Sequence, residues 1–214
     1  MTTATSMSPL VRDAHMLAKS LLADDPRRLA HVRGAALIAG MASGALRVDQ
    51  PETVVAAALL HDIGYAPAVA RTGFHPLDGA LFLAREGWPE SVVLLVGHHS
   101  HAVLLAPYYR VHNAMALLDR VPGQAEDIIT FSDLRAGANG MGAAPRDRID
   151  DMRRRHADRL FIPADIREAR FRMMLTAAAR INAAVHRATR TQPPRNLDDR
   201  QAALGTLVPR GVRA

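Results

Sequence analysis

Apolar residues recur along this chain with helical spacing, and no segment shows a convincing strand-like alternation. The pattern is clearest in the final segment, about 164–188, where one stripe of a helix would carry six apolar side chains. They are Phe171, Met174, Leu175, Ala178, Ile181 and Val185. We interpret this stripe as a surface for core or dimer packing. The run VVLLV at 92–96 is compatible with a buried strand, but its Pro-Glu start favours a helix.

Cap residues and prolines divide the rest of the pattern into helices. Ser8 can cap a first helix that ends near Leu22, and Asp25 precedes a proline at the first helical position. Further helices are expected over about 26–40 or beyond, 51–61, 75–86, 90–98, 111–120, 124–136, 147–159 and 164–188, with a short helix or turn at 67–71. A glycine-rich loop, GANGMGAAP, follows at 137–145. The sequence therefore predicts an all-α bundle of about seven to nine helices.

Length and composition indicate one domain followed by a tail. The chain has 214 residues, and 49% of them are hydrophobic, which is enough for a sizeable core. We assign residues 1–188 to a single helical domain whose motif-bearing core spans 26–136. Residues 189–214 contain Pro-Pro, scattered charges and little apolar periodicity, so we expect a mostly disordered tail.

Several features predict a cytoplasmic protein. Cysteine is absent, which excludes disulfides and thiolate metal sites. The N-terminus lacks the pattern of a signal peptide, and the uncharged stretch at 34–46 is too short and glycine-rich to span a bilayer. We therefore expect no membrane partner, and the sequence leaves a homo-oligomer open.

Positive charge is concentrated in the last third of the chain. Residues 1–145 carry 11 basic and 13 acidic side chains, whereas residues 146–214 carry 16 arginines and 8 acidic side chains. A basic end can bind nucleic acid. These arginines alternate with Asp and Glu and lack accompanying aromatic side chains, so we interpret them as a solvated face and expect no nucleic-acid partner.

The dipeptide His61-Asp62 is the most informative candidate for chemistry. It ends the apolar run VVAAALL at 54–60, and Gly64 follows two residues later. An imidazole and a carboxylate therefore stand where a buried helix is expected to end. Further candidates occur in apolar or turn-forming stretches, where an unpaired polar group would be costly. They are His31, His75, His98, His99 and Asp133.

This set of imidazoles and carboxylates is typical of a metal site. It suits iron, manganese or zinc, and magnesium is compatible with a more oxygen-rich position. A carboxylate can also bridge two cations, and a pair about 3.5–4 Å apart assists phosphoryl displacement while bound water supplies a hydroxide nucleophile. We therefore expect one or two divalent ions. Taken singly, each residue also has a structural explanation, such as a buried hydrogen-bonded histidine at His31 or a helix cap at His75.

The order of these residues resembles the HD-domain superfamily of metal-dependent phosphohydrolases. His-Asp-Ile-Gly at 61–64 is similar to the most recognisable motif of that family. The segment HPLDGA at 75–80 looks like its His-Pro-x-x-Gly-Ala element, and GHHS at 97–100 looks like its double-histidine element. TFSD at 130–133 resembles the helix that carries the final aspartate. The resemblance covers about residues 26–136 and implies an HD-domain-like helical bundle.

The resemblance also implies a binuclear metal site. The first ion would be held by His31, His61, Asp62 and Asp133. Asp62 would bridge to a second ion, held by His75, His98 and His99, and would orient the attacking hydroxide. Family members act on nucleotides and other phosphate esters, so the implied partner is a small phosphorylated, nucleotide-like substrate.

Two further positions bear on the substrate. Phosphate needs a cation near the metals, and Arg71, between the two histidine elements, is the first candidate, ahead of Arg33 and Arg135. Tyr65 stands where the cyclic-di-GMP phosphodiesterase branch has lysine, which argues against that branch.

The sequence leaves three functions open. The first is hydrolysis of a phosphate ester by metal-bound hydroxide. The second is oxygen activation, because a branch of the superfamily uses a His, His-Asp, His, His, Asp set to hold two irons that act on a small alcohol or phosphonate. The third is a non-catalytic ligand-binding protein, against which the complete ligand set argues.

Overall fold

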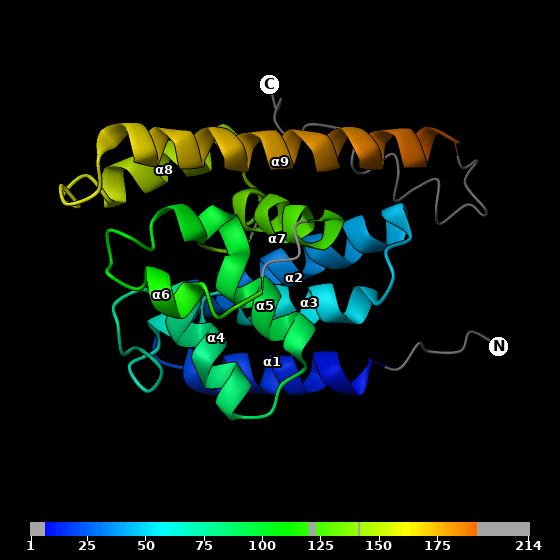
Figure 1. Cartoon of the computed structure of the whole chain (residues 1–214). Coiled ribbons are helices and arrows are strands. Elements are labelled where there is room, and N and C mark those ends of the chain that lie inside the picture. The colour runs from blue at the N-terminus through cyan, green and yellow to red at the C-terminus, as the bar shows by residue number, and fades with distance from the viewer. Residues whose placement is uncertain (1–6, 120–122, 141, 192–214) are drawn as a thin grey trace, which may run out of the picture.

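The computed structural model describes residues 7–119, 123–140 and 142–191 (Figure 1). Within these ranges the fold consists of nine α-helices and two short 3-10 helices, with no strand, so the predicted all-α class is confirmed. The last helix continues to Thr191, slightly beyond the predicted end at 188. Most of the predicted tail, from residue 192 onward, lies outside the described residues.

The helix boundaries follow the local signals in the sequence. The helices are α1 (Pro9–Leu21), α2 (Pro26–Leu46), α3 (Pro51–Leu60), α4 (His75–Arg85), α5 (Glu90–His98), α6 (His112–Met115), α7 (Gln124–Arg135), α8 (Pro145–Arg155) and α9 (Ala164–Thr191), with the 3-10 helices η1 (Ile63–Tyr65) and η2 (His99–Leu104). Asp25 caps α2, because its Oδ1 accepts a hydrogen bond of 2.9 Å from the Arg28 N–H. Residues 67–71 form turns rather than a helix, and α6 is shorter than predicted.

The helices pack around α2 and α3. Helix α2 packs on α3 and α7, while α1 packs on the outer side of α3 and α9 lies across α7 (Figure 1). Helix α3 is apolar all round and is buried over most of its length, as expected for a central helix. The apolar stripe of α9 faces this core, where Phe171, Met174 and Ile181 are buried. The predicted packing role of that stripe is therefore confirmed for the core.

Helix α2 is also long and apolar enough to cross a membrane by length and composition alone. In the structure one side of this helix is buried in the bundle, while Leu37 and Met41 on the other side are exposed. Val32, Ala35 and Ala39 are buried, and the helix packs on both α3 and α7. The small side chains allow the neighbouring helices to approach closely.

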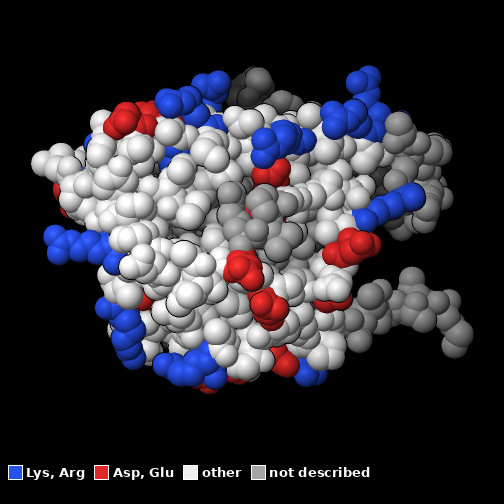
Figure 2. All heavy atoms as spheres, in the orientation of Figure 1, with Lys and Arg blue, Asp and Glu red and all other residues white. Residues whose placement is uncertain are grey.

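Charged side chains are dispersed over the surface drawn in Figure 2. On this face, basic and acidic residues are interspersed, and several basic side chains lie along the edge formed by α9. This face therefore presents no continuous basic stripe of the kind that tracks a nucleic-acid backbone.

The glycine-rich loop after α7 passes directly over α2. Gly140 has a φ of +75°, and a Cβ there would lie 2.6 Å from the Ala30 carbonyl oxygen. A Cβ on Gly34 would in turn overlap the backbone of Gly140. Glycine at both positions lets this loop contact α2 beside His31, which becomes important for the orientation of that histidine.

A buried carboxylate holds the segment that leads into α4. Asp78 is 2% exposed and accepts hydrogen bonds from the backbone N–H groups of Arg71 and Thr72, both 3.0 Å long. The Thr72 hydroxyl donates a third, of 2.8 Å. The carboxylate thereby fixes the turn that delivers His75, the first residue of α4.

We expect Asp78→Ala to lower the free energy of unfolding by about 3 kcal/mol, because three donors lose a charged acceptor. Urea denaturation measures this loss. Asp13→Ala is a matched control, because the Asp13 side chain on α1 is 59% exposed and should matter by no more than about 0.5 kcal/mol. Equal effects of the two substitutions would contradict the role given to Asp78.

Candidate metal centre

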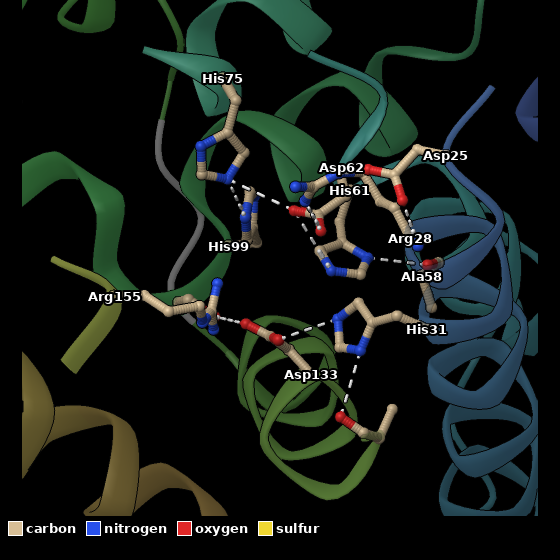
Figure 3. A network of polar contacts seen from close by, with 12 residues as sticks. Asp25, Arg28, His31, Ala58, His61, Asp62, His75, His99, Asp133 and Arg155 are labelled. Carbon is tan, nitrogen blue, oxygen red and sulfur yellow. Dashed lines mark hydrogen bonds and ion pairs between the residues drawn. The ribbon is translucent and has the colours of Figure 1, made fainter. Parts of the chain in front are cut away.

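Five parts of the chain bring six of the predicted ligands together. They are His31 on α2, His61 and Asp62 after α3, His75 at the start of α4, His99 after α5 and Asp133 on α7. Figure 3 shows their side chains directed toward a common space. Their ligand atoms form two groups, within each of which the atoms lie within 4.8 Å of one another. The first group is His31, His61 and Asp133, and the second is Asp62, His75 and His99.

In the first group, each histidine is oriented by a backbone carbonyl. His31 Nδ1 lies 3.1 Å from the Ala136 oxygen, and His61 Nδ1 lies 2.9 Å from the Ala58 oxygen. A carbonyl can only accept, so each ring carries its proton on Nδ1 and presents Nε2 to the cluster. His61 is 1% exposed, and its Nε2 has no hydrogen-bond partner among the described residues. An orphaned buried nitrogen is costly, and a bound cation would satisfy it.

In the second group, two imidazole nitrogens face each other. His75 Nε2 lies 3.1 Å from His99 Nε2, and His99 Nδ1 is bound to the Val96 carbonyl oxygen at 2.7 Å. The Asp62 Oδ1 atom lies 3.5 Å from His75 Nε2 and 3.6 Å from His61 Nε2. Asp62 thus lies between the two groups, where a carboxylate could contact two ions. The donor set fits divalent metals of the iron, manganese and zinc type.

The electrostatics favour deprotonated ligands at neutral pH. Burial opposes ionisation of Asp62, but His61 and His75 hold its pKa well below the usual range. Burial lowers the pKa of His75 strongly and that of His99 to about 4, so both imidazoles keep a free lone pair. His31 differs, because despite burial its hydrogen bond to Asp133 raises its pKa.

Three residues that the sequence analysis did not assign to the site hold the ligands in place. Arg28 Nη1 lies 2.7 Å from Asp62 Oδ2, and its guanidinium lies 3.8 Å from the centre of the Tyr65 ring. Tyr65 stacks on His75 with 3.9 Å between ring centres. The Ser100 hydroxyl donates to Asp133 Oδ2 over 2.6 Å. Each carboxylate therefore has one oxygen held by the protein and the other facing the histidines.

For Arg28, the spacing in the sequence could have indicated a position near the site. Arg28 lies three positions before His31, so the two side chains share one face of α2. Ser100 follows His99 directly, and no spacing rule marks it as a partner of Asp133.

His98, predicted as a ligand of the second ion, lies outside the cluster. Its Nε2 is 3.0 Å from the Leu118 carbonyl oxygen, and the side chain lines a separate cavity of about 290 Å³. Helix α5 ends at His98, and His99 continues with an extended ψ of 148°. Successive residues at this helix end therefore point in different directions, and the structure brings only the second histidine to the site.

Arg71, predicted to bind the substrate, is also outside the site. Its side chain is exposed, and its guanidinium donates to the carbonyl oxygens of Ala70 and Ala68. It does not line the pocket over the cluster, and neither do Arg33 and Arg135. The backbone of Arg71 supports the turn held by Asp78, and its side chain has no contact with the ligands among the described residues.

A pocket of about 310 Å³ opens over the cluster. One part of its wall is apolar or aromatic and includes Phe74, Leu105, Tyr109 and Ile162. Another part is rich in arginines from α2, α8, α9 and the α8–α9 connection, namely Arg28, Arg148, Arg153, Arg155, Arg159, Arg167 and Arg170. His156, whose pKa burial lowers to about 4, lines the same wall. The arginine-rich helices interpreted as a solvated face therefore also line the pocket.

The fold and the site define the class: an all-α protein with a histidine–aspartate cluster beneath a pocket. The HD domain family model matches residues 28–134, which is half of the chain. The chain therefore belongs to the HD-domain superfamily of metal-dependent phosphohydrolases. Comparison with curated proteins and with solved structures gives no match. The matched segment contains all six cluster residues, whereas α8 and α9 follow it.

Proposed function

We propose that this protein is a metal-dependent phosphohydrolase that cleaves a phosphate ester bond of a small, nucleotide-like substrate. The observation that carries the proposal is the position of two histidine–carboxylate groups beneath a pocket rich in arginine. Bound divalent ions would lower the pKa of water and stabilise charge on the phosphoryl oxygens. The chain itself supplies the ligands, the orientation and the surrounding charge.

The two groups suggest which residues would hold each ion. His31, His61 and Asp133 would hold one ion, and His75 and His99 the other. Asp62, which lies between the groups, is the candidate bridging ligand and would orient the attacking water.

The pocket walls suit the remainder of such a substrate. Arg148 Nη2 lies 3.6 Å from Asp133 Oδ1, so its positive charge offsets the carboxylate and reduces its repulsion of an anionic substrate. Phe74 and Tyr109, whose ring centres are 4.8 Å apart, offer an aromatic surface to an organic group. A volume of about 310 Å³ is at the small end of ligand pockets, which favours a small substrate.

Metal analysis of the purified protein, coupled to a phosphate-release screen over nucleotides and phosphomonoesters, tests the proposal. We expect one or two ions of iron, manganese or zinc per chain. Phosphate release should stop when a chelator removes the metal and return when Mn²⁺ is added. Bound iron without phosphate release from any of these esters would refute the hydrolase.

A second candidate is a di-iron oxygenase that acts on a small alcohol or phosphonate. The six clustered residues, without His98, make up the His, His-Asp, His, His, Asp set of the oxygen-activating branch, and four imidazoles suit iron. Oxygen consumption by the iron-loaded protein, without phosphate release, would favour this candidate. A protein that holds no metal and is unchanged by Asp62→Ala would instead be non-catalytic.

A further inference from the structure

One buried arginine of the pocket wall forms no ion pair with a carboxylate among the described residues. Arg170, on α9, is 9% exposed and lines the pocket over the metal cluster. Its Nε donates to the Ser100 carbonyl oxygen over 2.8 Å. Among the described residues, no carboxylate forms an ion pair with it, and its two terminal amino groups have no hydrogen-bond acceptor. Asp133 attracts this charge from beyond ion-pair distance. A largely buried cation without a contacting anion is costly, and an anion that entered the pocket would stabilise it.

The other arginines around the pocket differ from Arg170, either because a carboxylate pairs with them or because they are less buried. Arg28 pairs with Asp62 at 2.7 Å, and Arg153 pairs with Glu168 at 2.6 Å. Arg148 and Arg155 lie 3.3 Å and 2.8 Å from Asp151, respectively. Their charges are already matched within the described part of the chain. Two more, Arg159 and Arg167, contact a phenol and a carbonyl respectively, but neither is fully buried.

Ser100 connects this unpaired cation to the metal cluster. Its carbonyl accepts from Arg170, while its hydroxyl donates to Asp133 Oδ2. Ser100 is fully buried and has a left-handed conformation, with φ +52° and ψ +34°. Such a conformation is unfavourable for a residue with a Cβ and is typical of functional sites. Arg170 is therefore held one residue away from a predicted ligand, with its terminal amino groups left for a ligand.

We propose that Arg170 binds the phosphate group of the substrate. A guanidinium presents two parallel N–H groups, which match two oxygens of a phosphate. The proposal rests on the proposed hydrolase function and deepens it, because it gives α9, which follows the family-matched segment, a part in substrate recognition. It also supplies the cation that the sequence analysis sought in Arg71.

Binding of inorganic phosphate to the full-length protein as purified, with its bound metal, tests this assignment. Calorimetry on Arg170→Gln should show phosphate binding weakened by about tenfold or more, because a charge-assisted pair of hydrogen bonds is lost. Arg170→Lys, which keeps the charge but lacks the planar guanidinium, should bind phosphate with an affinity between those of the wild type and Arg170→Gln. Arg172→Gln, an exposed position two residues further along α9, removes the same charge and should bind phosphate as the wild type does.

Metal content and thermal unfolding, measured on each variant, separate binding from structure. Unchanged phosphate binding in Arg170→Gln would overturn the assignment, as would weakening that merely follows a loss of metal. If Arg170→Gln does not fold, unchanged phosphate binding in Arg170→Lys would overturn the assignment instead. Absence of phosphate binding to the wild type would also overturn it.

The two proposals fail separately. Arg170-dependent phosphate binding by a protein that hydrolyses no ester would refute the hydrolase and leave the phosphate site. Hydrolysis of p-nitrophenyl phosphate with the same KM in Arg170→Gln as in the wild type would refute the phosphate site and leave the hydrolase.

Discussion

Replacing either His61 or Asp133 with alanine should abolish metal binding at the first group and lower phosphate release by at least about 100-fold. Removal of a residue that merely supports a metal ligand typically costs 10–100-fold, and loss of a ligand should cost more. His61 Nε2 is buried with no hydrogen-bond partner among the described residues. Asp133 Oδ1 lies 3.2 Å from His31 Nε2, in the same group.

Elemental analysis of the purified variants measures the metal, and a phosphate-release assay measures the activity. His186→Ala is a matched control, because His186 is an exposed histidine on α9 and should keep both properties. Circular dichroism should show that His61→Ala and Asp133→Ala remain helical. Loss of metal in only one of these two variants would contradict a shared first site.

Gly64→Ala should lower the free energy of unfolding by about 3 kcal/mol or more and remove metal from the second group. A Cβ at Gly64 would overlap the backbone carbonyl of His75. The obstruction is backbone rather than the end of a flexible side chain, so the turn that carries His75 must move. The glycine of the His-Asp-Ile-Gly motif is therefore required because two ligand-bearing segments touch at this point.

Urea denaturation and metal analysis check both parts of this prediction. Gly44→Ala on α2 is the control, because a Cβ there meets no heavy atom within 4 Å. Alanine is the better helix former, so this variant should gain up to about 1 kcal/mol. A Gly64→Ala protein with wild-type stability and full metal content would show that the contact between these segments is not needed.

Much of the fold was predictable because its signals are local. Capping residues and prolines placed the starts of α1, α2, α3 and α4 within a residue or two, since a cap acts on backbone groups of its own first turn. The apolar stripe of α9 identified a packing face for the same reason. The segment at 67–71 was predicted only as a short helix or turn, and its link to α4 was less predictable, because the N–H groups of Arg71 and Thr72 are held by Asp78 from the next helix.

The candidate site was predictable in its residue types but not in its detailed geometry. The position of His61-Asp62 at the end of a buried helix was visible in the sequence, and the order of the remaining ligands resembled a known family. The choice between His98 and His99 was not visible, because it depends on the backbone dihedrals of one residue at the end of α5. The side chain of Arg71 was assigned from its position between two motifs, yet it folds back on its own loop.

The sequence by itself determined the helical class, the limits of most helices and the residues able to bind metal, because each follows from short-range spacing and side-chain chemistry. Tertiary structure alone decided which of those residues meet and what surrounds them. Arg148 and Arg170 are two arginines in a segment that carries many, and nothing in their spacing separates them from solvated neighbours. They line the pocket because α8 and α9 pack over the end of the bundle that holds the cluster, and such packing joins residues distant in the chain.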